Sequence, residues 1–254
     1  MMRRLAALLA VLVLPLGVQA EEVVLGLSSD KVAITSNFDG SDILVFGAVK
    51  REKAIPDVPL DVVVSIKGPS EPMTVRRKER RFGIWVNTQA VEIDAAPSFY
   101  AVSTTGPLSE VLSNVEDLRH RVSIGRAIRA VGATGQTEDV QAFTDAVIRI
   151  HKANDTYQVQ EGGVVLDEQT LFRTKITLPS NLTEGDYLTR IFLTREGKVV
   201  SSFETVIDVR KVGLERWLFT MSREQPFLYG LMSLAIAIFA GWGASAAFQL
   251  LRRG

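Results

Sequence analysis

The sequence contains no cysteine and only two histidines among its 254 residues. Without cysteine the chain can form neither a disulfide nor a thiolate metal site, so an exported domain of this composition is held together by core burial alone. The histidines, His120 and His151, stand 31 positions apart, a spacing that matches no zinc motif. We therefore expect no metal centre and no cofactor. We interpret both histidines as ordinary helix residues, with Glu116 one helical turn from His120.

Motifs that would indicate an enzyme are also missing. No serine stands in a Gly-x-Ser-x-Gly turn, and no glycine-rich stretch precedes a Lys-Ser or Lys-Thr pair. The 29 basic residues are balanced by 29 acidic ones, whereas a nucleic-acid-binding protein needs a strongly basic face. We therefore expect a protein that is not an enzyme and binds no nucleic acid. An enzyme with an unrecognised site stays an alternative.

Charge is absent from residues 227–251, which read FLYGLMSLAIAIFAGWGASAAFQLL. About 20 apolar residues in an α-helix cross the hydrocarbon core of a bilayer, so this segment predicts one transmembrane helix. Arg252 and Arg253 follow directly, and basic residues stay on the cytoplasmic side of a membrane. The sequence therefore predicts a single-pass protein of the bacterial inner membrane. Its N-terminal domain is expected in the periplasm and residues 252–254 in the cytoplasm.

Residues 1–20 have the pattern of a secretory signal peptide. Two arginines precede an apolar stretch at 5–17 that is too short to span a membrane, and residues 18–20 (Val-Gln-Ala) place small side chains where signal peptidase cuts. Cleavage after Ala20 is expected, and an uncleaved N-terminal anchor is the alternative.

Short β-type stretches separated by turn residues fill residues 21–106 and return at residues 153–212. The sequence therefore predicts a mainly β fold class, with one or two immunoglobulin-like β-sandwich modules. We prefer two modules, and the alternative is that both segments pair into one larger domain. The expected strands are 23–29, 31–36, 43–51, 60–68, a long strand or hairpin at 73–87, 91–93, 99–103, 163–166, 171–178, 186–194 and 199–209, with a hairpin turn at Glu196-Gly197-Lys198.

The spacing of apolar residues changes to three and four across residues 107–152, which predicts a helical segment made of two helices. Gly132 and Gly135 are expected to form the connector, and Thr137 is expected to cap the second helix. The predicted buried stripes are Leu108, Val111, Leu112, Val115, Leu118 and Val122 in the first helix, and Val140, Phe143, Val147 and Ile150 in the second.

Residues 213–226 are expected to form a juxtamembrane linker between the periplasmic domain and the membrane. Trp217 and Phe219 suit the interfacial zone of a bilayer, where amphipathic rings are enriched.

The densest run of charge, at residues 76–81, is the first candidate interaction surface. Its basic members are Arg76, Arg77, Lys78, Arg80 and Arg81, and Trp85 follows. One interpretation is a surface that binds an anion or an acidic partner. The other is a solvated edge strand, on which charge prevents pairing with a second sheet edge.

A stripe of small residues in the membrane segment is the second candidate surface. Ala237, Gly241 and Ser245 are spaced by four and share one face of the helix. Small residues allow close approach of two helices in a membrane, so this stripe predicts packing against a partner's helix or against a second copy of the chain. The alternative is that alanine and glycine are simply common in spanning helices.

A third stretch, Asp39-Gly40-Ser41-Asp42, faintly resembles a calcium-binding loop. It lacks the full series of ligands and the closing glutamate. We interpret it as a plain turn.

Several motifs together resemble an uncharacterised family of alphaproteobacterial transmembrane proteins. The resemblance covers the chain after residue 20 and implies a single-span protein without assigning any catalytic residue. It also implies that members are encoded beside sulfite-exporter-type permeases. The motifs are RRKER (76–80), GIWVN (83–87), PSFYA (97–101), LFR (171–173), Gly-x-Tyr (185–187) and LYG (228–230).

The sequence thus favours a membrane-anchored periplasmic accessory or scaffold protein that assists an inner-membrane partner, such as a transporter. The alternative is a periplasmic binding module for an anionic solute or an envelope polymer, which would use the basic run at 76–81.

Overall fold

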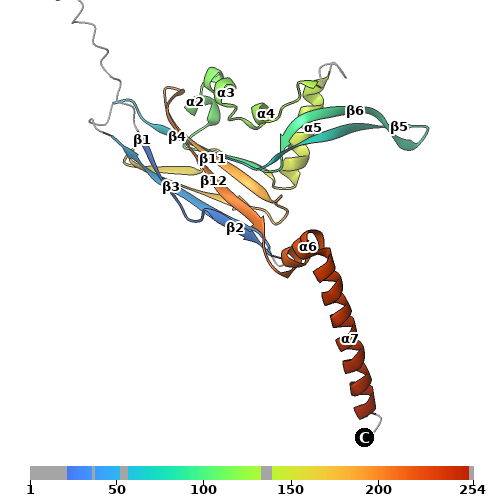
Figure 1. The fold of residues 1–254 in the computed structure, drawn as a ribbon. Helices are drawn as coiled ribbons and strands as arrows, with labels where there is room; N and C mark the ends of the chain where they lie inside the picture. The colour runs from blue at the N-terminus through green and yellow to red at the C-terminus, as the bar shows by residue number, and fades with distance from the viewer. Residues whose placement is uncertain (1–21, 36–37, 52–56, 133–138, 252–254) are drawn as a thin grey trace, which may run out of the picture.

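Two β-sheets form the body of the protein in the computed structural model, which describes residues 22–35, 38–51, 57–132 and 139–251 (Figure 1). The four-stranded sheet has the order β1 (Glu22–Leu27), β3 (Ser41–Lys50), β10 (Leu171–Leu178) and β9 (Val164–Asp167). The six-stranded sheet has the order β2 (Lys31–Ile34), β12 (Lys198–Lys211), β11 (Gly185–Arg195), β4 (Asp61–Lys67), β7 (Tyr100–Thr104) and β8 (Tyr157–Gln160). Neighbouring strands are antiparallel except β12 with β2 and β7 with β8.

Some predicted features lie outside the described residues. They are the signal peptide at 1–20, the connector and cap residues Gly135 and Thr137, and the tail at 252–254.

The main hydrophobic core lies between the two sheets. In β10 every second residue is buried, as expected for a strand with one face on the core and one in solvent. Its inward residues Phe172 and Ile176 belong to the same buried cluster as Val64 of β4 and Ile191 of β11. The two sheets therefore form a β-sandwich.

The preferred arrangement of two separate β modules differs from the structure. Strands from residues 153–212 pair directly with strands from residues 21–106, because β10 adds to β3 and β11 adds to β4. The two β segments therefore share one sandwich, which is the alternative left open by the sequence. The mainly β fold with a helical insert is confirmed, and the immunoglobulin-like strand arrangement stays a prediction.

A second hydrophobic core lies on the outer face of the six-stranded sheet, under the helical insert (Figure 1). The insert contains α2 (Leu108–Val111), α3 (Asn114–His120), α4 (Ile124–Ala127) and α5 (Val140–Ala153). Strand β4 lies between these two cores, and its five central residues are all buried. This explains its continuous apolar run, since a strand covered on both faces does not alternate.

The first predicted helix is broken in the structure. Leu112 is extended, and Ser113 begins α3 anew by accepting a hydrogen bond from the Glu116 amide at 3.4 Å. The break reorients α3, so Val115 and Leu118, which were predicted to be buried, are 66% and 58% exposed. The stripe prediction is therefore wrong for α3.

The second predicted helix is present as α5. Its residues Phe143 and Val147 are buried as predicted, whereas Ile150 is exposed. The helix begins after Asp139.

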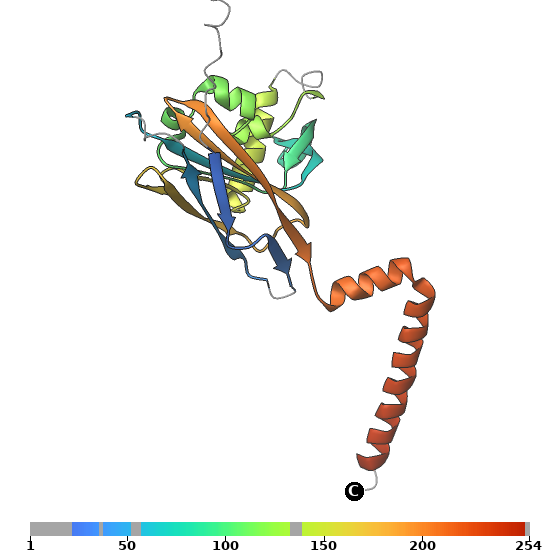
Figure 2. The same cartoon turned by 60° about the vertical axis from the view of Figure 1, so that its left-hand side comes forward.

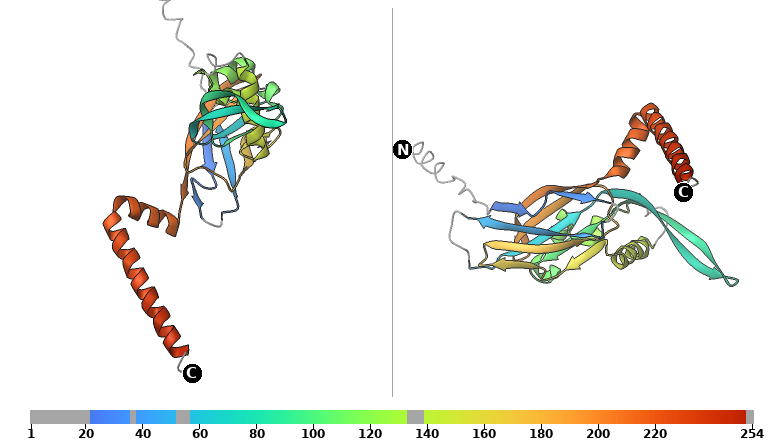
Figure 3. Two further views of the ribbon diagram at one scale, coloured as in Figure 1. Left: turned by 90° about the vertical axis from the view of Figure 1, so that its right-hand side faces the viewer. Right: turned by 90° about the horizontal axis from the view of Figure 1, so that it is seen from below.

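Strands β5 (Ser70–Arg81) and β6 (Ile84–Pro97) form a separate two-stranded hairpin that stands out from the sandwich (Figure 3). Its two-residue turn contains Phe82 and Gly83, which have φ angles of 51° and 85°. Positive φ at both turn residues gives a twist that matches a β-hairpin. The sequence predicted either one long strand or a hairpin at 73–87, and the structure shows a hairpin. The strand predicted at 91–93 is part of β6.

The chain ends in two helices joined by a bend at Gln225 (Figure 2). The predicted linker folds into α6 (Leu214–Glu224), in which Trp217 is half exposed. Helix α7 (Pro226–Leu251) follows, and its part from Pro226 to Ser245 is long and apolar enough to cross a membrane. The predicted membrane-spanning segment is thus a continuous helix.

Candidate functional site

The half of the β5–β6 hairpin nearest the body, residues 70–77 and 89–97, is called here the proximal half. It packs against the helical insert through Val91 and Ile93, which are both buried. The backbone of Ala95 exchanges two hydrogen bonds with Arg129, at 3.1 and 2.8 Å. The base of the hairpin is therefore fixed by apolar burial and by backbone pairing.

Arg77 holds the proximal half to the N-terminal end of α5. One guanidinium nitrogen lies 2.8 Å from the Asp139 carboxylate, and another donates to the Gln89 side chain at 3.1 Å. The guanidinium carbon also lies 4.8 Å from the centre of the Phe143 ring. The hydrogen bond from Arg77 lowers the pKa of Asp139 below its ordinary value. Arg77 is thus a structural contact, although the sequence grouped it with the candidate surface.

The remaining part of the hairpin, residues 78–88, is the distal half, and it ends in three exposed apolar side chains. Phe82, Ile84 and Trp85 are 106%, 64% and 69% exposed. They occupy the turn and the first two residues of β6. Only Trp85 was a candidate from the sequence, and the signal for the other two was the Phe-Gly pair within the predicted hairpin.

The basic run is divided between the two faces of the hairpin. Arg80 lies opposite Trp85 in the strand register, whereas Arg81 lies opposite Ile84 on the other face. Arg81 contacts Glu79 at 3.4 Å, and the Arg80 Nε donates to the Gly83 carbonyl at 3.4 Å. Residues 76–81 therefore do not form a single basic patch. Arg76, Lys78 and Arg80 share one face, and Arg77 and Arg81 point to the other.

A groove of about 610 Å³ separates the hairpin from α5. Arg76, Arg77 and Lys78 line one side, and Phe143, Asp145 and Arg149 are among the residues on the other. Because this groove contains a carboxylate as well as cations, its charge is mixed.

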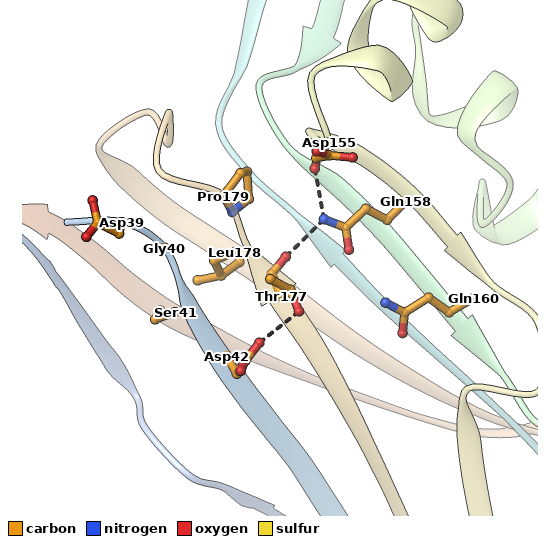
Figure 4. A pocket seen from close by; sticks show the side chains of 10 residues that line it. All are labelled: Asp39, Gly40, Ser41, Asp42, Asp155, Gln158, Gln160, Thr177, Leu178 and Pro179. Carbon is orange, nitrogen blue, oxygen red and sulfur yellow. Dashed lines mark hydrogen bonds between the residues drawn. The ribbon is translucent and has the colours of Figure 1, made fainter.

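The stretch predicted as a plain turn lines a second, polar cleft of about 530 Å³ (Figure 4). Asp42 contacts Lys175 at 2.8 Å and accepts a hydrogen bond from Thr177 at 2.7 Å, and these two contacts lower its pKa. The Gln158 amide donates to the Asp155 and Thr177 carbonyls. Within the described residues no group of acidic or histidine side chains is arranged to hold a metal ion.

The two histidines have separate local partners. His120 lies 3.3 Å from Glu116, as their shared helix face predicted, and packs on the Phe192 ring. His151 hydrogen-bonds Thr156 at 2.9 Å and stacks on Tyr157, and burial lowers the pKa of His151. These contacts are those of structural residues.

The predicted stripe of small residues lies exposed on α7. Ala237, Gly241 and Ser245 are all exposed, and a Cβ added to Gly241 would meet no atom of another element within 4 Å. The described part of the chain therefore leaves room for a second helix at this stripe.

The chain was compared with models of known protein families. Residues 22–250 match the family described as "Putative transmembrane protein (Alph_Pro_TM)". The chain belongs to this family. Membership confirms the resemblance found in the sequence, and the match covers the hairpin and most of α7.

A comparison with curated proteins found no match. Among solved structures, the chain is similar to Spo0M, a sporulation control protein from Bacillus subtilis, with 13% sequence identity and a TM-score of 0.30. The aligned part covers 80% of this chain and 55% of that protein. A likeness at this level supports no argument about fold or function.

Proposed function

We propose that this protein is a periplasmic accessory or scaffold protein of the bacterial inner membrane, anchored by α7, which binds an inner-membrane partner through the tip of the β5–β6 hairpin. The observation that carries the proposal is the exposure of Phe82, Ile84 and Trp85 at the end of the distal half of the hairpin, where residues 78–88 belong to none of the hydrophobic clusters of the described structure. No catalytic arrangement is needed for this role.

The tip has the composition of a protein-binding site. Burial of a side chain of the size of phenylalanine or isoleucine contributes about 1.5–3 kcal/mol each. Tryptophan and arginine are also enriched among the residues that dominate binding energy at interfaces, and Arg80 lies opposite Trp85. A partner that encloses the tip on both faces would bury these three apolar side chains beside Arg80, which lies opposite Trp85, and Arg81, which lies opposite Ile84.

The direction of the hairpin favours a protein partner. In Figure 1 the hairpin extends sideways from the body, whereas α7 leaves the body at its lower end. Figure 3 shows the same lateral projection from below. The tip therefore points towards a neighbour beside this protein in the membrane, such as the periplasmic part of a transporter.

The second candidate function is binding of an anionic solute or envelope polymer through residues 76–81. Exposed Arg76, Lys78 and Arg80 on one face of the hairpin favour it. It is the weaker candidate, because Arg77 and Arg81 already contact carboxylates.

The test is site-specific photo-cross-linking in bacterial membranes. A cross-linkable residue at position 85 is expected to give a discrete adduct, and the same residue at Val206, also exposed, is the control position. Combining Phe82→Ser with Ile84→Thr should remove the adduct. A matched pair on the four-stranded sheet, Val24→Thr with Leu44→Thr, should retain it. An adduct that survives the tip variant would show that the partner binds elsewhere.

A second arm of the test concerns the helix stripe. If the stripe packs against the same partner, Gly241→Leu should reduce co-purification from mild detergent, because the larger side chain prevents close approach. Leu234→Ile, away from the stripe, should not. Full retention of the partner in Gly241→Leu would leave α7 as a tether only.

A further inference from the structure

Three cationic side chains from separate parts of the chain gather at the C-terminal end of α3. Lys67 is the last residue of β4, Arg190 lies in β11, and Arg121 follows α3 directly. Lys67 is paired with Tyr100 and with Leu188, two residues before Arg190 on the same strand face. This face is the one covered by the helical insert.

Arg190 is fixed at this position by carbonyl groups. Its guanidinium donates to the His120 carbonyl at 2.7 Å and to the Arg121 carbonyl at 3.3 Å, where a cation complements the C-terminal end of a helix. Its Nε is buried without a hydrogen-bond partner in the described structure. The carbonyl groups at the end of α3 thus explain part of the position of the Arg190 side chain. They do not explain why Lys67 and Arg121 also lie here.

The carboxylates around this cluster have other contacts. Asp117 accepts hydrogen bonds from the Val122 and Ser123 amides at 3.0 and 2.7 Å, and from the Ser123 hydroxyl. Glu116 contacts Arg119 and His120, as described above. Glu204 lies opposite Arg190 in the register but forms no ion pair with it. In the part of the chain that the structure describes, Lys67, Arg121 and Arg190 have no carboxylate partner.

A shallow groove of about 820 Å³ adjoins the cluster and is also basic. Arg121 lines it together with Arg126 and Arg129. The whole stretch from residue 118 to residue 131 contains four arginines and no acidic residue. The chain therefore concentrates positive charge here. These cations repel one another, and a bound anion would reduce that repulsion.

The position of the groove argues for a water-soluble ligand. Helices α3 and α4 lie at the end of the body opposite α6 and α7 in both views (Figures 1 and 2). Headgroups of the membrane that holds α7 are therefore on the other side of the sandwich. Arginine and lysine together are the usual protein ligands of phosphate and carboxylate groups.

We propose that Lys67, Arg121 and Arg190, with Arg126 and Arg129 in the adjoining groove, form a binding site for an oxyanion group of a soluble ligand. This site lies outside residues 76–81, and it goes beyond the proposed function of the hairpin. Burial, and then the nearby Arg190 and Arg121, lower the pKa of Lys67, which agrees with an uncompensated cationic cluster.

The test is a calorimetric titration of inorganic phosphate into the full chain, which is kept in a zwitterionic detergent. The double variant Lys67→Gln with Arg121→Gln should bind phosphate at least tenfold more weakly. The control, Lys31→Gln with Arg173→Gln, removes the same charge at exposed positions on β2 and β10 and should bind as the unaltered protein does. Equal weakening in both would mean that only net charge matters, and that result would overturn the site, as would no phosphate binding at all. A parallel titration with citrate decides whether a carboxylate ligand binds more tightly than phosphate.

A second measurement follows Lys67 itself by NMR. The charged and titratable groups around it are Tyr100 from β7, Arg190 from β11, Asp117 from α3, and Arg121, which follows α3 directly. Bound phosphate should raise the pKa of Lys67, because the anion offsets its cationic neighbours, so affinity should fall as pH rises through that pKa. An unchanged pKa at saturating phosphate would contradict the site. The tip variant Phe82→Ser with Ile84→Thr should keep phosphate binding, so the two proposals fail independently.

Discussion

In the proximal half of the β5–β6 hairpin, Val91 and Ile93 are buried against the helical insert, whereas Ile84 and Trp85 in the distal half face solvent. Both halves belong to the same two antiparallel strands and use the same cross-strand pairing. The comparison shows that burial here is decided by what covers a strand rather than by the strand itself. An isolated two-stranded ribbon is only marginally stable, so the packed proximal half supports the distal half, whose tip stays uncovered.

The largest expected difference between the halves concerns core residues. Ile93→Ala should lower the free energy of unfolding by about 2–5 kcal/mol, because it leaves a cavity in a buried cluster. Ile84→Ala, at an exposed position, should change it by no more than about 0.5 kcal/mol. Denaturant unfolding of the full chain in mild detergent measures both values. Similar losses for the two variants would mean that the distal half is also covered in the free protein.

A smaller difference is expected between two turns of the same geometry. Gly83 in the hairpin and Gly197 between β11 and β12 both have positive φ, and alanine there costs about 1–2 kcal/mol. The Gly197 carbonyl also accepts a hydrogen bond from the Ser113 amide at 2.8 Å, which ties its turn to α3. Gly197→Ala should therefore lower the melting temperature by about 2–8 °C.

Gly83→Ala should act locally instead. Its expected effect is faster amide hydrogen exchange in the distal half with the melting temperature unchanged, because that half unfolds without the body. A drop in melting temperature as large as that of Gly197→Ala would show that the tip is coupled to the sandwich.

The smallest expected effect concerns the contacts of Arg77, which lies at the boundary between the two halves. Arg77→Gln should speed amide exchange in the proximal half near Gln89, whereas Lys78→Gln, one residue further out, should not. The pKa of Asp139 is lowered in the folded chain, so its stabilising contact with Arg77 is present at neutral pH and is lost as pH falls through that lowered value. Amide exchange in the proximal half, measured from neutral to acidic pH, should therefore become equal in Arg77→Gln and the unaltered protein at low pH. A difference that persists in acid would assign the effect to the Phe143 contact.

Local sequence patterns predicted most of the helices and strands. They predicted few of the contacts between these elements. The alternation in residues 171–178 predicted β10 with its bounds, and the apolar run predicted α7 within one residue of its start. The short strand β8 was missed, since its four residues carry a weak pattern and it is held by parallel pairing with β7. The buried stripe of the first helix failed at Val115 and Leu118, because a Ser113 cap restarts the helix in another direction.

The candidate sites show the same division. Residues 76–81 are adjacent in sequence, yet strand alternation sends Arg80 and Arg81 to opposite faces, so one run of charge becomes two surfaces. Lys67, Arg121 and Arg190 are far apart in sequence and share no motif, so their meeting could not be predicted without the strand register and the position of α3.

The sequence by itself determined that the segment that forms α7 is apolar and of spanning length, because hydropathy and length are properties of a continuous segment. It also determined the mainly β character and the hairpin turn at Glu196-Gly197-Lys198, since these follow from alternation and local backbone preference. Only the tertiary structure decided that two β segments form one sandwich, because strand pairing joins residues that are distant along the chain. Only the tertiary structure, too, left Phe82, Ile84 and Trp85 uncovered, since exposure depends on which elements cover a strand, and the buried clusters shared with the helical insert reach only the proximal half of the hairpin.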